Sequence, residues 1–186
     1  MNSARHPVLE VLSQYRPQDP AETADVERTS AFTAASADPW SRVLPLHLTA
    51  SALIVHPDSG RVLLRWHQRQ QSWLQVGGHG DPGEREALAI ALREAREETG
   101  LTDLAAWPDA TLRQVVIVSV PAGRGEPAHQ HADLRFLLAT QTPEAIAAES
   151  PDAPLRWLSL AQARELTAED NLRDLFPRVA RLLVSD

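Results

Sequence analysis

Residues 77–101 read GGHGDPGEREALAIALREAREETGL, and this stretch decides how the chain is interpreted. It places Glu94, Glu97 and Glu98 on an expected helix that follows a glycine-rich turn. At about 100° per residue, Glu97 lies about 60° to one side of Glu94 and Glu98 about 40° to the other. The three carboxylates are therefore predicted to share one arc of the helix surface.

Such a cluster of like charges needs a compensating partner. Two unit charges ~4 Å apart repel by roughly 4 kcal/mol at an effective dielectric constant of 20. The repulsion is tolerated if water surrounds the acids or if a cation binds them, and hard divalent cations such as Mg²⁺ prefer oxygen ligands. For the EAREE segment alone, a solvated acidic face on a surface helix is an equally supported interpretation.

The whole stretch resembles the Nudix box, the signature of the Nudix hydrolases. That box is Gly, five residues, Glu, a spacer, then Arg-Glu-aliphatic-x-Glu-Glu-x-Gly-aliphatic. The matching residues are Gly78, Glu84, Arg93, Glu94, Ala95, Glu97, Glu98, Gly100 and Leu101. The spacer is one residue longer than in the family, so either Glu84 or Glu86 fills the first glutamate position.

The resemblance implies a divalent-metal-dependent pyrophosphohydrolase. Such an enzyme cleaves a nucleoside diphosphate linked to another group by attack of water at phosphorus, and a metal cancels charge and polarises the phosphoryl oxygens. The implied cofactor is Mg²⁺, with Mn²⁺ as a possible substitute, and the implied partner is a small nucleotide-derived substrate. The alternative is a non-catalytic Nudix-fold module that binds or senses a nucleotide.

The same resemblance implies roles for the box residues. The implied metal ligands are Glu94, Glu97, Glu98, the carbonyl of Gly77 and Glu84. The implied catalytic residues are Glu97, Glu94 and Arg93. Glu97 is either a ligand or the base that deprotonates the water. Arg93 is expected to brace the acidic cluster through a salt bridge to Glu84 or Glu86, and simple i,i+4 pairing with Glu97 is the alternative.

A second group of polar residues lies in the segment HQHADLRF, residues 129–136. If this segment is a strand, His131, Asp133 and Arg135 point the same way as His129, and the apolar residues point the other way. The polar side either faces the metal cleft and contacts substrate, or is the solvated face of an outer strand. A zinc site on the two histidines is not favoured, because no third ligand stands at a characteristic spacing.

Several other residues near the box are candidates for contact with substrate. His79 follows the double glycine and is expected within reach of a bound phosphate, although a loop histidine without a role is as well supported. Arg65, His67 and Arg69 flank a turn near the same sheet edge; they either supply positive charge for the substrate or belong to a solvated loop, and the loop is the better-supported interpretation for each. By the same resemblance, some relatives carry an extra catalytic glutamate in the loop region where this chain has Glu144 and Glu149. Trp66, Trp73 and Trp157 are expected to pack in or around the core, and the alternative is that one of them stacks on a base.

Composition limits the class of protein. The 186 residues are 43% hydrophobic and 23% charged, which is typical of one globular domain. The absence of cysteine excludes disulfides and thiolate metal sites, and the net charge of −7 argues against nucleic acid as the main partner. No apolar run approaches a membrane span and no signal peptide is visible, so we expect a cytoplasmic protein without a membrane partner. The choice between monomer and homodimer stays open.

The hydrophobic pattern predicts an α/β fold, a Nudix-type α/β/α sandwich around a mixed β-sheet. Residues 1–45 form an N-terminal helical extension, with helices over 6–15 and 20–37, and residues 46–186 form the Nudix domain. The extension either packs on the main fold as an addition or cap, or lies across a dimer. Expected strands span 48–55, 61–66, 72–76, 112–120, 132–140 and 155–158. Expected helices span 84–99, 159–166 and a last segment from 167 that is interrupted at Pro177. Asp19 is the expected N-cap of the helix from 20, and capping boxes are expected at Ser159–Gln162 and at Thr167–Asp170.

The box helix is expected to bury the face opposite its carboxylates. Its predicted apolar stripe is Leu88, Ala91, Leu92, Ala95 and Thr99, at the spacing of one helix face. Gly100 is expected to end the helix.

Overall fold

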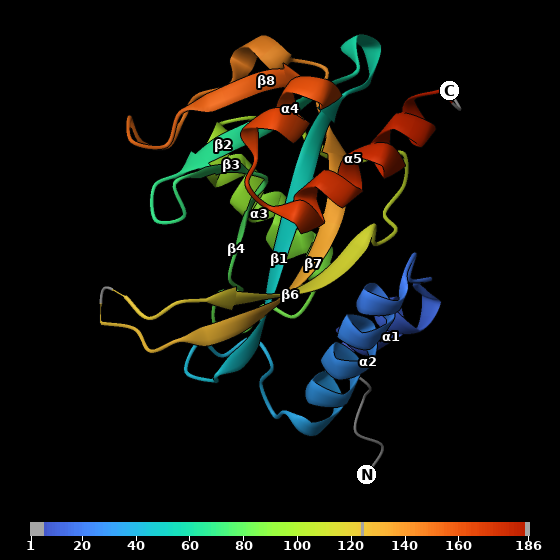
Figure 1. The fold of residues 1–186 in the computed structure, drawn as a ribbon, viewed down its shortest axis with the longest axis vertical. Helices are drawn as coiled ribbons and strands as arrows, with labels where there is room; N and C mark the ends of the chain where they lie inside the picture. The colour runs from blue at the N-terminus through green and yellow to red at the C-terminus, as the bar shows by residue number, and fades with distance from the viewer. Residues whose placement is uncertain (1–5, 124, 185–186) are drawn as a thin grey trace.

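A mixed sheet forms the centre of the computed structural model, which describes residues 6–123 and 125–184 (Figure 1). The strands are β1 (Leu46–His56), β2 (Arg61–His67), β3 (Ser72–Leu74), β4 (Val76–Gly78), β5 (Ala105–Ala106), β6 (Gln114–Val120), β7 (His129–Ala139) and β8 (Leu155–Ser159). Strands β1 and β7 pair in parallel, and every other pairing among the described strands is antiparallel. The predicted mixed sheet is therefore confirmed.

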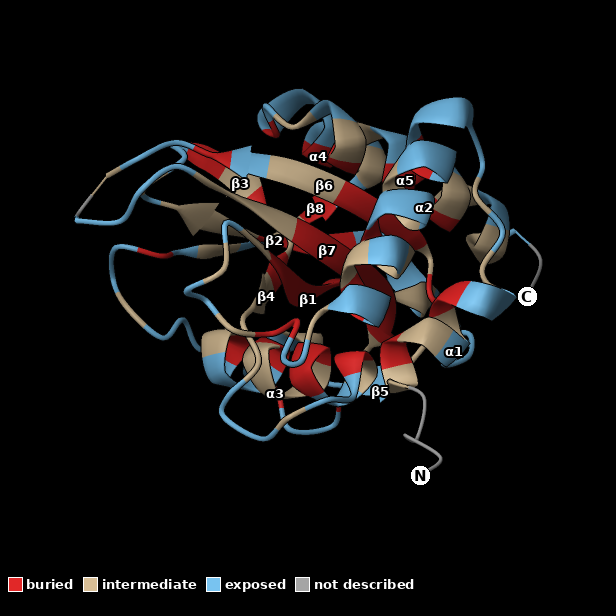
Figure 2. Cartoon of the chain, turned by 90° about the horizontal axis from the view of Figure 1, so that it is seen from below, coloured by how far each residue is buried: buried red, intermediate tan, exposed pale blue. Residues whose placement is uncertain are grey.

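Helices cover both faces of this sheet (Figure 2). Alternate residues of β1 enter different cores: Ala52 and Ile54 pack with α1 (Pro7–Gln14) and α3 (Ala87–Thr99), whereas Leu53 and Val55 face the other way. That second core is closed by α4 (Leu160–Leu166) and α5 (Asp170–Leu183). The arrangement is the α/β/α sandwich that the sequence predicts. None of the helices among the described residues is long and apolar enough to span a membrane.

The box helix α3 begins at Ala87, three residues later than the expected start at Glu84. Glu84 instead belongs to the preceding turn, where its amide donates to the Asp81 carbonyl at 2.9 Å. The extra spacer residue is accommodated before the helix begins. Gly100 ends the helix in the left-handed conformation, at φ 71°, as predicted.

The buried face of α3 differs slightly from the predicted one. Leu88 and Leu92 are only partly buried, whereas Ile90 is fully buried. The buried residues of α3 are Ala87, Ile90, Ala91, Ala95 and Thr99. Small residues on this face let the helix lie close to β1 and β4, which brings its carboxylates near the glycine turn.

Some expected boundaries were wrong. The segment 72–76 is divided, because β3 pairs with β2 whereas β4 pairs with β1. Helix α5 also continues through Pro177, because the buried Leu175, Phe176 and Val179 hold the helix on the sheet despite the missing amide. A capping box at Thr167 is absent; the Thr167 hydroxyl accepts from the Glu169 amide at 3.2 Å and makes a turn.

The N-terminal extension packs on the main fold. Val8 and Leu12 of α1 belong to the same core as α3. Helix α2 (Pro20–Ala35) is capped by Asp19, as predicted, and ends two residues before the expected Ala37. Two short 3₁₀ turns, η1 (Pro57–Ser59) and η2 (Pro143–Ala145), complete the described elements.

Candidate active site

Two of the three box acids point toward the glycine turn of β4. The side chains of Glu94 and Glu98 are 14% and 12% exposed, whereas that of Glu97 is 55% exposed. The Gly77 amide donates to Glu98 Oε2 at 3.1 Å. A Cβ atom at Gly78 would lie 2.6 Å from the carboxyl carbon of Glu94, so only glycine permits this approach.

Burial leaves this pair of acids short of solvation. Burial is the main reason that the pKa of Glu98 rises to about 7, although Arg65 and the Gly77 amide lower it. Burial likewise raises the pKa of Glu94. A divalent cation would supply the missing compensation, and the donor set of carboxylate and carbonyl oxygens fits a hard cation such as Mg²⁺.

Arg93 holds the acids in place. Its Nε and Nη2 atoms donate to the two oxygens of Glu84 at 3.1 and 2.9 Å. Its Nη1 atom donates to Glu94 at 3.1 Å and to Glu97 at 3.0 Å. Both interpretations of Arg93 therefore apply, because it makes the bracing ion pair and the i,i+4 pair.

The loop glutamate that pairs with Arg93 is Glu84 and not Glu86, which precedes the first residue of α3 and makes no capping bond. Asp81 of the same loop adds a longer ion pair of 3.8 Å to Arg93. The Asp81 amide donates to Glu84 Oε2 at 2.8 Å, so both carboxylate oxygens have donors. Arg93 Nη2 also donates to the carbonyl of His79 at 2.8 Å. This network fixes the loop between β4 and α3.

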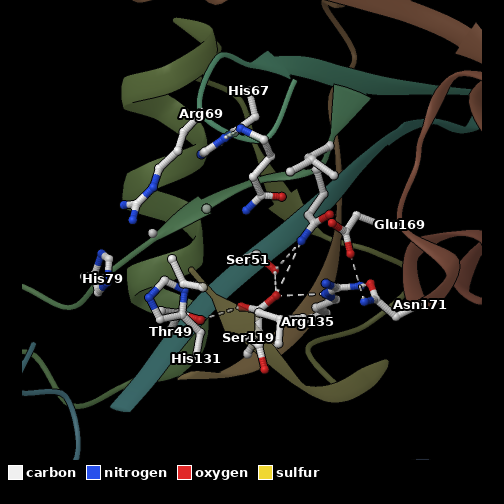
Figure 3. A pocket seen from close by; sticks show the side chains of 18 of the residues that line it. Thr49, Ser51, His67, Arg69, His79, Ser119, His131, Arg135, Glu169 and Asn171 are labelled. Atoms are coloured by element: carbon white, nitrogen blue, oxygen red, sulfur yellow. Dashed lines mark hydrogen bonds and ion pairs between the residues drawn. The ribbon is translucent and has the colours of Figure 1, made fainter. Parts of the chain in front are cut away.

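A cavity of about 870 Å³ lies beside the glycine turn. Figure 3 shows His79 and His131 at one end of it, and Arg135, Glu169 and Asn171 at the other. Glu94, Gly77 and Gly78 also line the cavity. From outside the box come the arginines Arg42, Arg69 and Arg135 and the histidines His67 and His131. An anionic ligand would find positive charge within reach of the acid pair.

The parallel pairing of β1 and β7 builds one wall of this cavity. His47 stands opposite His131, and Thr49 stands opposite Asp133. Asp133 and Arg135 are 5% and 3% exposed, so the alternative of a solvated outer face is wrong for these two. The predicted polar side of the 129–136 segment faces the cavity.

Asp133 is the centre of a buried polar network. Its carboxylate accepts from Thr49 Oγ1 at 3.0 Å and from Ser51 Oγ at 2.7 Å. Arg135 Nε donates to it at 2.8 Å, and Gln75 Nε2 at 3.4 Å. The Oε1 atom of Gln75 has no hydrogen-bond partner among the described residues, which leaves a buried acceptor beside the cavity.

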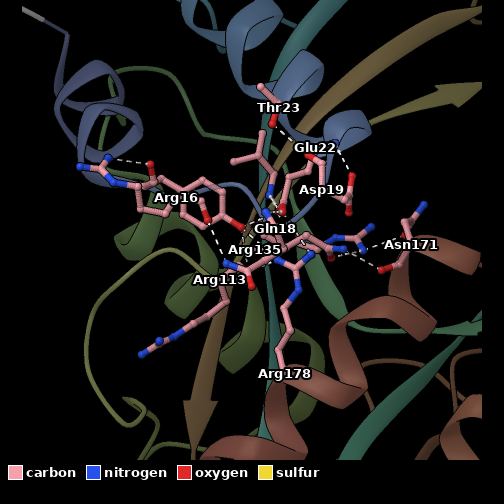
Figure 4. Close-up of polar contacts among 12 residues, drawn as sticks. Arg16, Gln18, Asp19, Glu22, Thr23, Arg113, Arg135, Asn171 and Arg178 are labelled. Atoms are coloured by element: carbon pink, nitrogen blue, oxygen red, sulfur yellow. Dashed lines mark hydrogen bonds and ion pairs between the residues drawn. The ribbon is translucent and has the colours of Figure 1, made fainter.

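Arg135 connects this network to α5. Its Nη1 atom donates to Gln114 Oε1 at 3.0 Å and to Asn171 Oδ1 at 2.8 Å (Figure 4). Asn171 in turn lies at the start of α5 and lines the cavity. The guanidinium of Arg135 is thus held from three sides at a fixed position on the cavity wall.

Four histidines gather at the other end of the wall. His47 Nε2 lies 3.1 Å from His79 Nε2, and His129 Nε2 lies 3.1 Å from His131 Nε2. Burial is the main cause that lowers the pKa of His79 to about 3 and that of His131 to about 4, so both are neutral near pH 7. The sequence lacked a third ligand at a characteristic spacing, but the fold brings His47 and His79 to His131.

Other residues named from the sequence lie away from the cavity or serve as partners. Arg65 makes salt bridges of 3.2 Å to Glu98 and to Glu149, so Glu149 approaches the acid cluster through Arg65. Glu144 lies in η2 and is exposed. Arg69 pairs with Glu126 at 2.8 Å. The tryptophans Trp66, Trp73 and Trp157 are not among the residues that line the cavity.

The site also contains residues that the sequence did not single out. Arg42 lies between α2 and β1, where no motif marks it. Gln75, Asn171 and His47 likewise belong to segments without a recognisable motif. For His47 a signal existed, because it alternates with Thr49 and Ser51 on one face of β1.

Solved structures with a similar fold include the Ap4A hydrolase of C. elegans in a binary complex. That structure has a TM-score of 0.59 and 19% identity, and the match covers 75% of this chain and 98% of that chain. The dihydroneopterin triphosphate pyrophosphohydrolase of E. coli has a TM-score of 0.52 and 21% identity, covering 77% and 97% of the two chains. At these identities, the likeness concerns the fold.

One curated relative is closer in sequence. The probable DHNTP pyrophosphohydrolase of Lactococcus lactis subsp. cremoris (strain MG1363) is 35% identical over 108 residues, which is 57% of this chain. The chain spans 61% of the length of that relative. The model of the NUDIX domain family matches residues 45–179, from the start of β1 into α5. The chain therefore belongs to the Nudix hydrolase family.

Proposed function

We propose that this protein is a divalent-metal-dependent pyrophosphohydrolase that cleaves the diphosphate of a small nucleotide-derived compound by attack of water at phosphorus. The observation that carries the proposal is the convergence of Glu94 and Glu98, both nearly buried, on the Gly77–Gly78 turn beside a large cavity. Acids placed this way are costly without a cation. The 35% identical relative, named a probable DHNTP pyrophosphohydrolase, supports the same class of reaction.

The proposed cation is Mg²⁺, with Mn²⁺ as a substitute. Glu94, Glu98 and the carbonyl of Gly77 would hold it, and Glu97 lies at the exposed side of the same helix surface. Bound there, Mg²⁺ would neutralise phosphate charge and lower the pKa of the attacking water. We assign Glu84 to bracing, because Arg93 and the Asp81 amide already occupy its oxygens.

The chain's own residues then orient the reactants. Arg42 and Arg69 supply positive charge on the cavity wall for the phosphates, and His79 and His131 offer neutral hydrogen-bonding groups nearby. Asp133 fixes Arg135, whose guanidinium is positioned before any ligand arrives. Such pre-positioning lowers the entropic cost of reaching the reactive geometry.

We assign one of two roles to Glu97: it accepts the proton of the attacking water, or it is a ligand of the metal. Its carboxylate is more exposed than those of Glu94 and Glu98, and Arg93 holds it at 3.0 Å. The two roles are distinguishable by experiment. Glu97→Gln lowers kcat with unchanged Mg²⁺ affinity if Glu97 handles the proton, and it weakens Mg²⁺ binding if Glu97 is a ligand.

The test is turnover of a panel of diphosphate compounds by the purified full chain with Mg²⁺ or Mn²⁺. The panel contains DHNTP, nucleotide sugars, ADP-ribose, dinucleoside polyphosphates, coenzyme A and oxidised nucleoside triphosphates. We expect hydrolysis of at least one compound, lost in Glu98→Gln and retained in the exposed helix variant Arg96→Gln. Saturable binding of a nucleotide without any turnover would instead identify a nucleotide sensor. The cytoplasmic location stays a prediction of the sequence, and the sequence leaves the choice between monomer and homodimer open.

A further inference from the structure

Three histidines from separate segments converge at one end of the cavity. His47 comes from β1, His79 follows β4 and His131 comes from β7. One ring nitrogen from each lies within 4.8 Å of those of the other two. Among the described residues this is the group of three or more histidine or acidic side chains whose donor atoms lie close enough together to share one ion.

The ring orientation of His47 is fixed by a backbone contact. Its Nδ1 atom lies 2.9 Å from the Leu44 carbonyl oxygen, so the Nδ1–H group donates a hydrogen bond to that oxygen. The Nε2 atom therefore carries no hydrogen and keeps a free lone pair. That Nε2 atom is the one directed at His79 Nε2, 3.1 Å away. A metal-ligating histidine characteristically donates its other ring N–H to a carbonyl or carboxylate in this way.

The spacing suits a small tetrahedral ion. Zinc binds imidazole nitrogen at about 2.0–2.1 Å, which places neighbouring tetrahedral ligand atoms roughly 3.4 Å apart. The contact of 3.1 Å between His47 and His79 is close to that value. The ligand atoms of all three rings lie within 4.8 Å of one another, so binding one ion requires the remaining nitrogen to move closer by at most about 1.4 Å.

The donor chemistry differs from that of the acid cluster. Imidazole nitrogen suits Zn²⁺ and neighbouring transition metals, whereas Mg²⁺ prefers oxygen. Three neutral nitrogen donors carry no charge to repel one another, so the cluster persists without an ion. His79 and His131 both line the cavity, so a fourth coordination position would open toward it.

We propose that His47, His79 and His131 form a second metal site, selective for Zn²⁺ or a similar nitrogen-preferring transition metal, on the wall of the cavity. The site is separate from the glutamate cluster and does not depend on the proposed hydrolysis. Its open position would accept an oxygen of an anionic ligand. His129, which stacks on His47 with ring centroids 5.3 Å apart, borders the site.

The test is a titration of the full chain with Zn²⁺ in excess Mg²⁺, followed by calorimetry, and with Co²⁺, followed by the visible absorption of a tetrahedral complex. We expect one Zn²⁺ per chain. His47→Gln, His79→Gln and His131→Gln should each weaken binding by at least an order of magnitude. His56→Gln, at the far end of β1 and bonded to Ser59, is the matched control and should bind as the unmodified chain does.

Two further measurements keep the outcome decisive. Thermal unfolding of each variant checks the fold. His79 lies in a loop and not in the sheet, so His79→Gln is the variant least coupled to folding. Glu98→Gln should retain Zn²⁺ binding even if it abolishes hydrolysis. Zinc binding that is unchanged in each of the three single histidine variants, or that is lost in Glu98→Gln, would overturn the proposal.

Discussion

Arg93 and Glu84 form a two-contact ion pair across the junction between the β4–α3 loop and α3, with Nε–Oε1 at 3.1 Å and Nη2–Oε2 at 2.9 Å. The pair ties the loop that follows Gly78 to the helix that carries the acids. Lysine keeps the charge of arginine but presents a single ammonium group and cannot make the forked contact.

Arg93→Lys should therefore lower kcat/KM by about 10- to 100-fold, the range found when groups that orient metal ligands are replaced. The measurement is steady-state hydrolysis of the best panel compound at several Mg²⁺ concentrations. Arg96→Lys, on the exposed face of the same helix, is the control. Equal activity in the two lysine variants would show that the forked contact has no role.

Gly78→Ala should displace the Glu94 carboxylate. The added Cβ would lie 2.6 Å from that flexible group, which moves at little cost in stability but no longer points at the turn. We expect a large loss of Mg²⁺-dependent turnover with a melting temperature near that of the unmodified chain. Gly123→Ala, whose Cβ would meet Arg69 Nη2 at 3.7 Å and no closer atom of the described residues, should change neither quantity.

Gly77→Ala should act differently, through the fold. Here the Cβ would lie 2.3 Å from Ser51 Cβ, and φ is +148°. Neither the neighbouring strand nor the backbone can yield cheaply, so we expect poor folding, measured by thermal unfolding and by soluble yield. A stable Gly77→Ala protein would contradict the close packing of β4 on β1.

The raised pKa of Glu98 makes a pH-dependent prediction for the metal-free protein. Because the folded-state pKa, about 7, exceeds the ordinary value of 4.5, the folded state binds more protons than the unfolded state between these values. The contribution of Glu98 to stability is therefore present below pH 4.5 and is lost as the pH rises through 7. The shift corresponds to roughly 3 kcal/mol at most.

Glu98→Gln removes this titration and keeps the shape. With a chelator present, the variant should match the unmodified chain near pH 5 and exceed it in unfolding free energy near pH 8. Taking the difference between the two proteins cancels the opposite contributions of His79 and His131, whose lowered pKa values favour folding as the pH rises through 6.5. Mg²⁺ should reverse the order at pH 8. A difference that is the same at both pH values would refute the assignment.

The buried pair of Glu22 and Arg178 joins the N-terminal extension to α5, with 3.0 Å between Oε1 and Nη1 (Figure 4). Tyr15 Oη and the Val115 amide also donate to Glu22. Arg178→Met leaves the carboxylate buried without its cation, so it should lower the unfolding free energy by about 3–5 kcal/mol.

The matched control is Asp170→Asn, which removes an exposed ion pair with Arg173 on the same helix. Such pairs contribute about 0–1 kcal/mol. Chemical denaturation measures both variants. If Arg178→Met costs no more than Asp170→Asn, the extension is not anchored by this pair.

Local signals made much of the fold predictable. The alternation in residues 129–136 indicated a strand with one polar side, and the caps at Asp19 and Ser159 marked helix starts correctly. Gly100 ended the box helix for the same local reason. Each of these features depends on a few neighbouring residues, which is the range over which sequence patterns report structure.

What could not be predicted depends on contacts between distant segments. The parallel pairing of β1 with β7 brings His47 opposite His131, and no local pattern specifies that partner. Arg42 and Asn171 reach the cavity through tertiary packing alone. The passage of α5 through Pro177 likewise follows from burial of its neighbours, which overrides the local cost of proline.

The register of β1 against β7 has a consequence for how this protein can change. Because side chains alternate along a strand, inserting one residue between His131 and Asp133 would turn Arg135 into the apolar layer and Leu134 into the cavity. The same strand alignment therefore determines which side chains face the ligand and which pack in the core. New specificities are open to the chain at Arg42, His67 and Arg69, which stand outside this pairing, whereas the β1–β7 wall tolerates only exchanges made position for position.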